Sequence, residues 1–162
     1  MKRQQGFSLI ELLIVVAIIL IIAAIAIPNL LRSRIAANES SAVGSMRTIN
    51  TSEITYSSTY PDVGYSVAFT DLGGSCASTQ PTSTSACLID SVLAGATAST
   101  SPKSGYFFSY ASVVGTPSVA YTALALPANR GQTGQRTFFS DQSGVIRFDA
   151  TGTATATSSP TQ

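Results

Sequence analysis

The sequence predicts an α+β fold in which one long amino-terminal α-helix packs on a four-stranded antiparallel β-sheet. Three observations lead to this expectation. An almost unbroken apolar run fills residues 7–28, an amphipathic helical pattern follows over residues 29–60, and β-prone runs separated by turns fill residues 105–150. The chain has 162 residues, which is enough for one apolar helix and one small domain with a modest core.

The apolar run has the length of a membrane span. As a helix rising about 1.5 Å per residue, residues 7–27 measure roughly 31 Å, close to the roughly 30 Å of a hydrocarbon layer. Lys2 and Arg3 precede the run, and basic residues favour the cytoplasmic side of a first span. We therefore expect a single-pass segment with a cytoplasmic amino terminus and export of the chain that follows Pro28.

Glu11 interrupts this run. An ionisable group inside a membrane segment is costly and marks, by default, a functional site with a partner to be found. The alternative is that Glu11, about one turn from the start of the helix, reaches the lipid headgroups by itself. The sequence leaves both interpretations open.

The order of these residues resembles the amino-terminal signature of type IV pilins and their pseudopilin relatives. Basic residues come first, then Gly6, then Phe7, then Glu11 four positions later, and Pro28 closes the apolar run. An ordinary signal peptide instead carries its cleavage site after the apolar region. The resemblance implies that a prepilin peptidase removes residues 1–6 as a leader, cutting between Gly6 and Phe7, and N-methylates Phe7. The short leader resembles the type IVa branch.

The resemblance also implies a function. The chain would be a structural subunit, as a major pilin, that polymerises as a homo-oligomeric helical filament through its amino-terminal helix. An inner-membrane platform protein and an assembly ATPase would be its machinery. The precursor would stand in the bacterial inner membrane, in contact with lipid, and the product in an extracellular pilus fibre.

Three residues are expected to act in assembly: Phe7, Glu11 and Pro28. Cleavage would create a positive amino terminus on Phe7 at the same end of the helix as Glu11. A Glu11 carboxylate facing the Phe7 amine of a neighbouring copy would neutralise both charges and fix the axial register. Pro28 deletes one backbone hydrogen bond, and in the family this region of the helix extends during assembly.

The second half of the expected helix, residues 29–60, carries an apolar stripe that should form the core against the sheet. Its members recur at intervals of three, four and seven, as one face of a helix requires: Ile35, Ala42, Met46, Ile49 and Tyr56. The charged residues of the segment are taken as part of its polar face: Arg32, Arg34, Glu39, Arg47 and Glu53.

Residues 61–104 read as a turn-rich loop between helix and sheet. Cys76 and Cys87 bracket its Ser/Thr-rich part, and in an oxidising exported compartment two cysteines indicate a disulfide. Closing this loop would stabilise the fold by about 2 to 3 kcal/mol. A helical turn is expected over residues 88–93, with one face packed in the core: Leu88, Ile89, Val92 and Leu93.

Four strands are expected from runs rich in aromatic and β-branched residues, over residues 105–114, 119–126, 137–140 and 145–149. A sheet with one apolar face needs a covering layer, which the stripe of residues 29–60 supplies. The tail, residues 151–162, has no apolar periodicity and is expected to be flexible.

Composition argues against catalysis. The chain has no His and only two Cys, so the usual zinc ligand sets and a Ser-His-Asp triad are missing. We expect no catalytic residue, no cofactor and no metal site. Asp141 and Asp149 are expected to form turns, because Ca²⁺ needs about six to eight oxygen ligands. Major pseudopilins of type II secretion generally carry calcium in this region. The lack of enough acidic residues for such a site here, together with the expected disulfide, favours a pilus subunit.

Charge gives no case for nucleic acid as a partner. The formal net charge is +1, and removal of Lys2 and Arg3 would turn the balance slightly negative, whereas nucleic-acid binding needs a basic patch. Four basic side chains of the second half are expected to be scattered and solvated: Lys103, Arg130, Arg136 and Arg147.

Several alternatives to a major pilin stay open. The chain could be a type II secretion pseudopilin acting in the periplasm, a minor pilin or adhesin, a DNA-uptake pilin, or a membrane-tethered enzyme. Twitching motility, cell adhesion, secretion, DNA uptake and electron transfer all use similar subunits, so the residue pattern does not choose among these roles.

Overall fold

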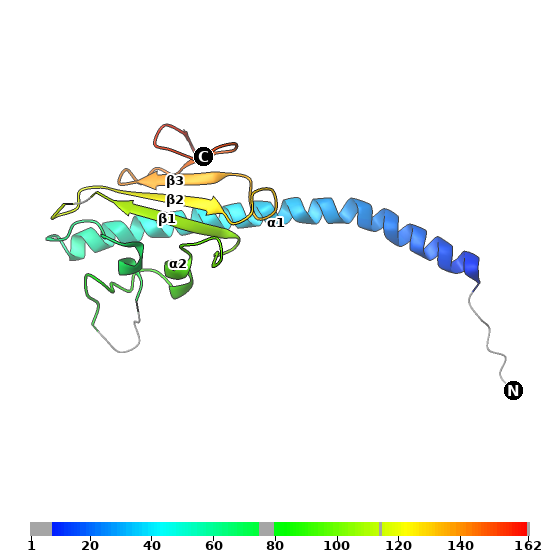
Figure 1. Cartoon of the computed structure of the whole chain (residues 1–162), viewed down its shortest axis with the longest axis horizontal. Helices are drawn as coiled ribbons and strands as arrows, with labels where there is room; N and C mark the ends of the chain where they lie inside the picture. Colours follow the sequence, from blue (N-terminus) through cyan, green and yellow to red (C-terminus); the bar gives the residue numbers. More distant parts are fainter. Residues whose placement is uncertain (1–7, 75–79, 114, 162) are drawn as a thin grey trace. The chain divides into compact units, whose positions relative to one another are not determined.

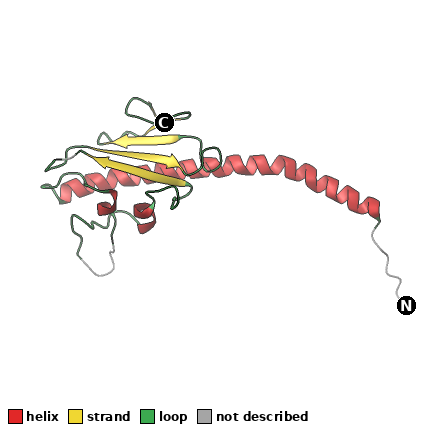
Figure 2. Ribbon diagram, viewed as in Figure 1, coloured by secondary structure: helices red, strands yellow, loops and turns green. Residues whose placement is uncertain are grey.

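The computed structural model describes residues 8–74, 80–113 and 115–161. The chain divides into two compact units, Met1–Arg34 and Ile35–Gln162, called here the N-terminal unit and the C-terminal unit. One long helix, α1 (Leu9–Thr59), gives its first part to the N-terminal unit and its second part to the C-terminal unit. An antiparallel sheet follows it in the chain (Figures 1 and 2). The α+β class is confirmed.

The sheet has five strands in chain order, each antiparallel to its neighbours. The strands are β1 (Tyr106–Ser112), β2 (Tyr121–Pro127), β3 (Thr137–Asp141), β4 (Arg147–Asp149) and β5 (Ser159–Pro160). Two short helical segments precede it: η1 (Phe69–Leu72) and α2 (Ser91–Gly95).

The expectation of four strands is therefore corrected to five. The extra strand, β5, comes from the tail that the sequence predicts to be flexible, and Ser159 pairs with Phe148 of β4. The tail also donates from the amide of Ala154 to the Thr137 hydroxyl at 2.8 Å, and Ala154 is buried. Backbone and hydroxyl hydrogen bonds, which apolar periodicity does not reveal, hold this tail on the sheet.

The apolar stripe of α1 packs as predicted. Ala42, Met46, Ile49 and Tyr56 are buried in the core of the C-terminal unit together with inward-facing side chains of β1, β2 and β3, while Ile35 is half-buried. Asn50 fixes the position of the helix on the sheet. Its amide donates to the Ser140 hydroxyl at 2.9 Å and its carbonyl accepts from the Tyr121 hydroxyl at 3.0 Å.

The loop of residues 61–104 contains the expected helical turn, shifted toward its carboxyl end. Asp90 caps α2 by accepting from the amide of Leu93 at 2.8 Å, so the helix begins only at Ser91. Leu93 is buried, but Val92 is exposed and does not join the core as predicted. Cys76 lies outside the described residues, and its pairing with Cys87 stays a prediction.

Candidate functional site: an exposed apolar helix with one carboxylate

The first part of α1 presents apolar side chains on all its faces. Large apolar residues between Leu9 and Leu31 are 43% to 76% exposed in the chain alone. Soluble monomers rarely expose contiguous apolar surface on this scale, and such surface marks contact with a membrane or another protein. By length and composition, α1 can cross a membrane, and it is the single helix of the described residues that can. This surface is the candidate functional site.

Glu11 lies in the first turn of α1. Its Oε2 accepts a hydrogen bond from the backbone amide of Ser8 at 2.9 Å, and the residue is exposed. An acidic group in the first turn is favoured because the free amides of a helix amino terminus carry partial positive charge. Within the described part of the N-terminal unit, Glu11 is the one acidic side chain on the apolar surface.

Gly6 and Phe7, the expected cleavage site and methylated residue, lie outside the described residues. Their roles stay predictions. Pro28 is an exposed residue inside α1, where it offers no amide hydrogen to the carbonyl of Ala24. The surroundings of Pro28 thus contain one helical hydrogen bond fewer, and its role in assembly also stays a prediction.

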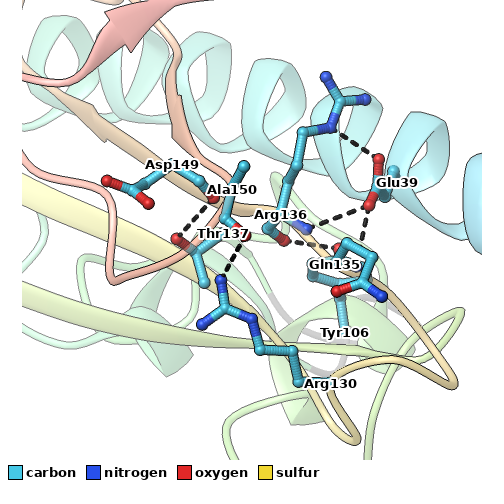
Figure 3. A network of polar contacts seen from close by, with 8 residues as sticks. All are labelled: Glu39, Tyr106, Arg130, Gln135, Arg136, Thr137, Asp149 and Ala150. Carbon is cyan, nitrogen blue, oxygen red and sulfur yellow. Dashed lines mark hydrogen bonds and ion pairs between the residues drawn. The ribbon is translucent and has the colours of Figure 1, made fainter.

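A buried carboxylate, Glu39, ties α1 to the start of β3 in the C-terminal unit (Figure 3). Its Oε1 accepts from the backbone amides of Gln135 and Arg136 at 2.9 and 3.1 Å, and its Oε2 accepts from Nε of Arg136 at 2.7 Å. The Arg136 guanidinium also lies 5.6 Å from the ring centre of Phe138 and 5.3 Å from that of Phe148. One carboxylate therefore satisfies two backbone donors and one cation.

Burial on its own raises the pKa of Glu39, but the hydrogen bonds from Gln135 and Arg136 outweigh this and hold the pKa below its ordinary value. Since the folded pKa is the lower one, the charged form stabilises the fold above the unfolded pKa, near 4.5. This contribution is lost as the pH falls below about 4.5 toward the folded pKa.

We expect Glu39→Ala to lower the free energy of unfolding at pH 7 by about 2 kcal/mol, because two backbone amides lose their buried acceptor. Arg136 adds little to this figure because it is partly exposed. Tyrosine fluorescence of the full chain in detergent micelles measures the change, because all tyrosines lie in the C-terminal unit. Ser40→Ala, at the exposed neighbouring position, is the control; equal stability of the two variants would contradict the assigned role.

A second buried carboxylate, Glu53 of α1, binds Ser66 in the segment that follows the helix. Glu53 is 0% exposed. Its Oε2 accepts from the Ser66 amide at 3.0 Å and its Oε1 from the Ser66 hydroxyl at 2.5 Å, while the Tyr110 hydroxyl donates to the Ser66 carbonyl at 2.9 Å. Burial raises the pKa of Glu53, and hydrogen bonds from Ser66 and Tyr110 offset that only in part.

The four basic residues predicted to be scattered and solvated are partly or fully exposed, and each also makes a specific contact. Lys103 pairs with Asp90 at 2.9 Å, and Arg136 pairs with Glu39. Arg130 donates to the carbonyl of Ala150 at 2.7 Å and Arg147 to that of Ser158 at 3.1 Å. The Arg147 contact holds the tail on the sheet, and the Arg130 contact ties the loop between β2 and β3 to the residue that follows β4. The sequence pattern does not reveal either contact because both acceptors are backbone carbonyls.

Asp141 and Asp149 take the turn-forming role that the sequence predicts. Asp141 accepts from the amide of Ser143 at 2.9 Å. Asp149 accepts from the amides of Thr151 and Gly152 at 2.8 and 2.6 Å, and these bonds lower its pKa. In the described part of the chain, no group of three metal-ligating side chains gathers around them.

The polar residues that sequence reasoning missed are the buried ones, Glu39, Asn50, Glu53 and Ser66. They hold the C-terminal unit together and are satisfied by the fold itself, since no buried side-chain polar atom among the described residues lacks a hydrogen-bond partner. The surface left without a partner is the apolar one of the N-terminal unit, so the arrangement is suited to binding lipid or other copies.

Known proteins that resemble this chain are subunits of pili and fimbriae. The prokaryotic N-terminal methylation motif matches residues 1–27. Over 39 residues, 24% of this chain and 30% of the relative, the chain is 62% identical to a type IV wide pilus major component of Thermus thermophilus. Over 70 residues, 41% of this chain and 32% of the relative, it is 40% identical to a type IV major pilin protein of Myxococcus xanthus.

A fimbrial protein of Pseudomonas aeruginosa is 41% identical over 80 residues, which cover 44% of this chain and 52% of the relative. The chain thus matches about a third to a half of the length of these relatives. No solved structure matches it.

Proposed function

We propose that this chain is the major structural subunit of a type IV pilus; its amino-terminal methylation motif and its similarity to type IV pilins support the proposal. The subunit stands in the membrane as a precursor and then polymerises into a helical, homo-oligomeric fibre. The apolar part of α1 serves both stages, first against lipid and then against other copies.

The observation that carries this proposal is the exposed apolar helix with a lone carboxylate in its first turn. In a purely lipid-facing anchor, an ionisable group such as Glu11 costs free energy. A helix that also packs against copies of itself can use the carboxylate to bind a positive amino terminus on the neighbour. The charged pair then specifies the register of the packed helices.

Processing is part of the proposal. A prepilin peptidase cuts between Gly6 and Phe7 and methylates the new amino terminus, so the cation that faces Glu11 arises only in the mature subunit. The precursor inserts with Lys2 and Arg3 on the cytoplasmic side, in keeping with the charge bias of membrane proteins. A platform protein and an assembly ATPase of the inner membrane move the mature subunit into the fibre.

Filaments sheared from the cell surface test the proposal. We expect this chain to dominate the sheared fraction, and mass spectrometry to find a mature protein that begins at N-methylated Phe7. A chain that keeps residues 1–6 and never enters a polymer would overturn the proposal. Short periplasmic fibres would indicate a secretion pseudopilin, and a trace amount in long fibres would indicate a minor pilin.

A further inference from the structure

Two charged side chains of the C-terminal unit, Arg47 and Asp62, make no hydrogen bond or ion pair with any residue that the structure describes. All other charged side chains described in this unit have a partner, namely Glu39, Glu53, Asp71, Asp90, Lys103, Arg130, Arg136, Asp141, Arg147 and Asp149. The two exceptions have opposite charges, and both residues are exposed.

Arg47 and Asp62 cannot pair within one chain. Arg47 lies on α1, and about 18 Å of helix separate it from Thr59, where α1 ends. Asp62 follows in a tight turn that stays at the end of the helix, because the amides of Val63 and Gly64 both donate to the carbonyl of Tyr60 at 3.0 Å. A partner for either charge must come from another molecule.

Arg47 stands beside a groove of about 610 Å³ between α1 and the last strands of the sheet. The apolar part of the groove comes from half-buried Val43 and Phe148 and from exposed Pro160. Arg136 also lines it, but this guanidinium is already paired with Glu39. Arg47 therefore supplies the uncompensated positive charge of a groove that is otherwise partly apolar.

The turn that carries Asp62 has the complementary chemistry. Pro61 and Asp62 are both exposed, so the turn presents a small apolar ring next to a free carboxylate. A guanidinium binds a carboxylate through two parallel hydrogen bonds, which gives the contact direction as well as charge complementarity.

We propose that the groove beside Arg47 on one copy receives the Pro61–Asp62 turn of the next copy, with the Asp62 carboxylate bound by the Arg47 guanidinium. The proposal rests on the function proposed above and names a contact within the fibre. Because groove and turn are different surfaces, the contact is heterologous. A row of copies joined in this way ends with one free groove and one free turn unless it closes into a ring, so the contact is compatible with a filament.

Charge exchange tests the contact in the full chain expressed in cells that make the fibre. Arg47→Glu and Asp62→Arg each place like charges together at every such contact. We expect each to lower the sheared fibre fraction at least about fivefold, because juxtaposed like charges suppress an interface. The double variant Arg47→Glu/Asp62→Arg restores the opposite charges in exchanged positions and should recover about half of the wild-type fibre or more.

Two controls complete the test. Gln142 is exposed on a turn, and Gln142→Glu and Gln142→Lys change the net charge in either direction without touching groove or turn, so wild-type fibre yield is expected. Arg47→Cys/Asp62→Cys should give a ladder of oligomers with a short bismaleimide, and neither single variant should give one.

Wild-type yield from both single charge variants, or a double variant as poor as the singles, overturns the pairing and leaves the proposed function intact. A wild-type chain that enters no fibre overturns both.

Discussion

Glu11→Leu is expected to abolish fibre formation while leaving membrane insertion intact. Leucine makes α1 more apolar, so the helix still enters lipid. In the packed fibre, the positive amino terminus on Phe7 of a neighbouring copy would lose its partner away from water. Removing one member of a buried pair typically costs about 3 to 5 kcal/mol, which corresponds to at least a hundredfold fewer correctly packed contacts. Carbonate extraction of membranes measures insertion, and shearing followed by immunoblotting measures fibres.

Glu11→Asp is the matched control for this prediction. It keeps the charge on a shorter side chain, so its fibre yield should lie between those of the wild type and Glu11→Leu. Leu13→Ile, also on the exposed apolar surface, changes a side chain while keeping its volume and the charge of the helix, and should assemble. Normal fibres from Glu11→Leu would show that the carboxylate only faces lipid headgroups, which is the simpler interpretation of an acidic residue near a helix end.

The parts of the fold that sequence reasoning could predict are those with a strong periodic signal. The apolar run, the stripe of Ala42, Met46, Ile49 and Tyr56, and β1 to β4 are all marked by hydrophobic side chains, whose spacing the residue order records directly. For the candidate site the same holds for Glu11, since a carboxylate is conspicuous in an apolar run. The sequence does not predict strand β5, because its partners are backbone groups and hydroxyls.

Glu39 and Glu53 show a different failure. Their charge predicts that both lie on the polar face, yet positions 39, 42, 46, 49, 53 and 56 follow the alternation of three and four residues that defines one helix face. The signal was therefore present in their spacing. What the spacing does not contain is the set of donors that makes their burial tolerable, because Ser66, Gln135 and Arg136 come from distant segments.

Glu53 is the position in the C-terminal unit where we expect the largest loss of stability. Glu53→Ala removes a fully buried side chain and leaves the Ser66 amide without an acceptor, while the Ser66 hydroxyl keeps only the Tyr110 hydroxyl as a partner. The cavity and the unpaired amide together should lower the free energy of unfolding by about 3 to 4 kcal/mol. Denaturant titration of the full chain in detergent micelles, followed by tyrosine fluorescence, measures this loss.

Glu53→Gln separates the shape of this side chain from its charge. The Gln carbonyl can still accept from the Ser66 amide, and its amide group can donate to the Ser66 hydroxyl, so we expect a change within about 1 kcal/mol at pH 7. A loss as large as that of Glu53→Ala would contradict the view that the neutral form fits this site.

The pH dependence of stability in the wild type and Glu53→Gln shows in which direction folding shifts the pKa of Glu53. The folded pKa of Glu53 lies above the unfolded value near 4.5, so as the pH rises the unfolded chain loses its proton first and the fold is weakened. Stability from Glu53 is therefore greatest below about pH 4.5 and declines as the pH rises through the folded pKa.

Glu39 acts in the opposite direction, but it is common to the wild type and Glu53→Gln, so its effect cancels in the difference between their stabilities. Relative to Glu53→Gln, the wild type should gain stability as the pH falls from 7 toward 4.5; a loss over that interval would mean that Glu53 is held as a stabilised carboxylate.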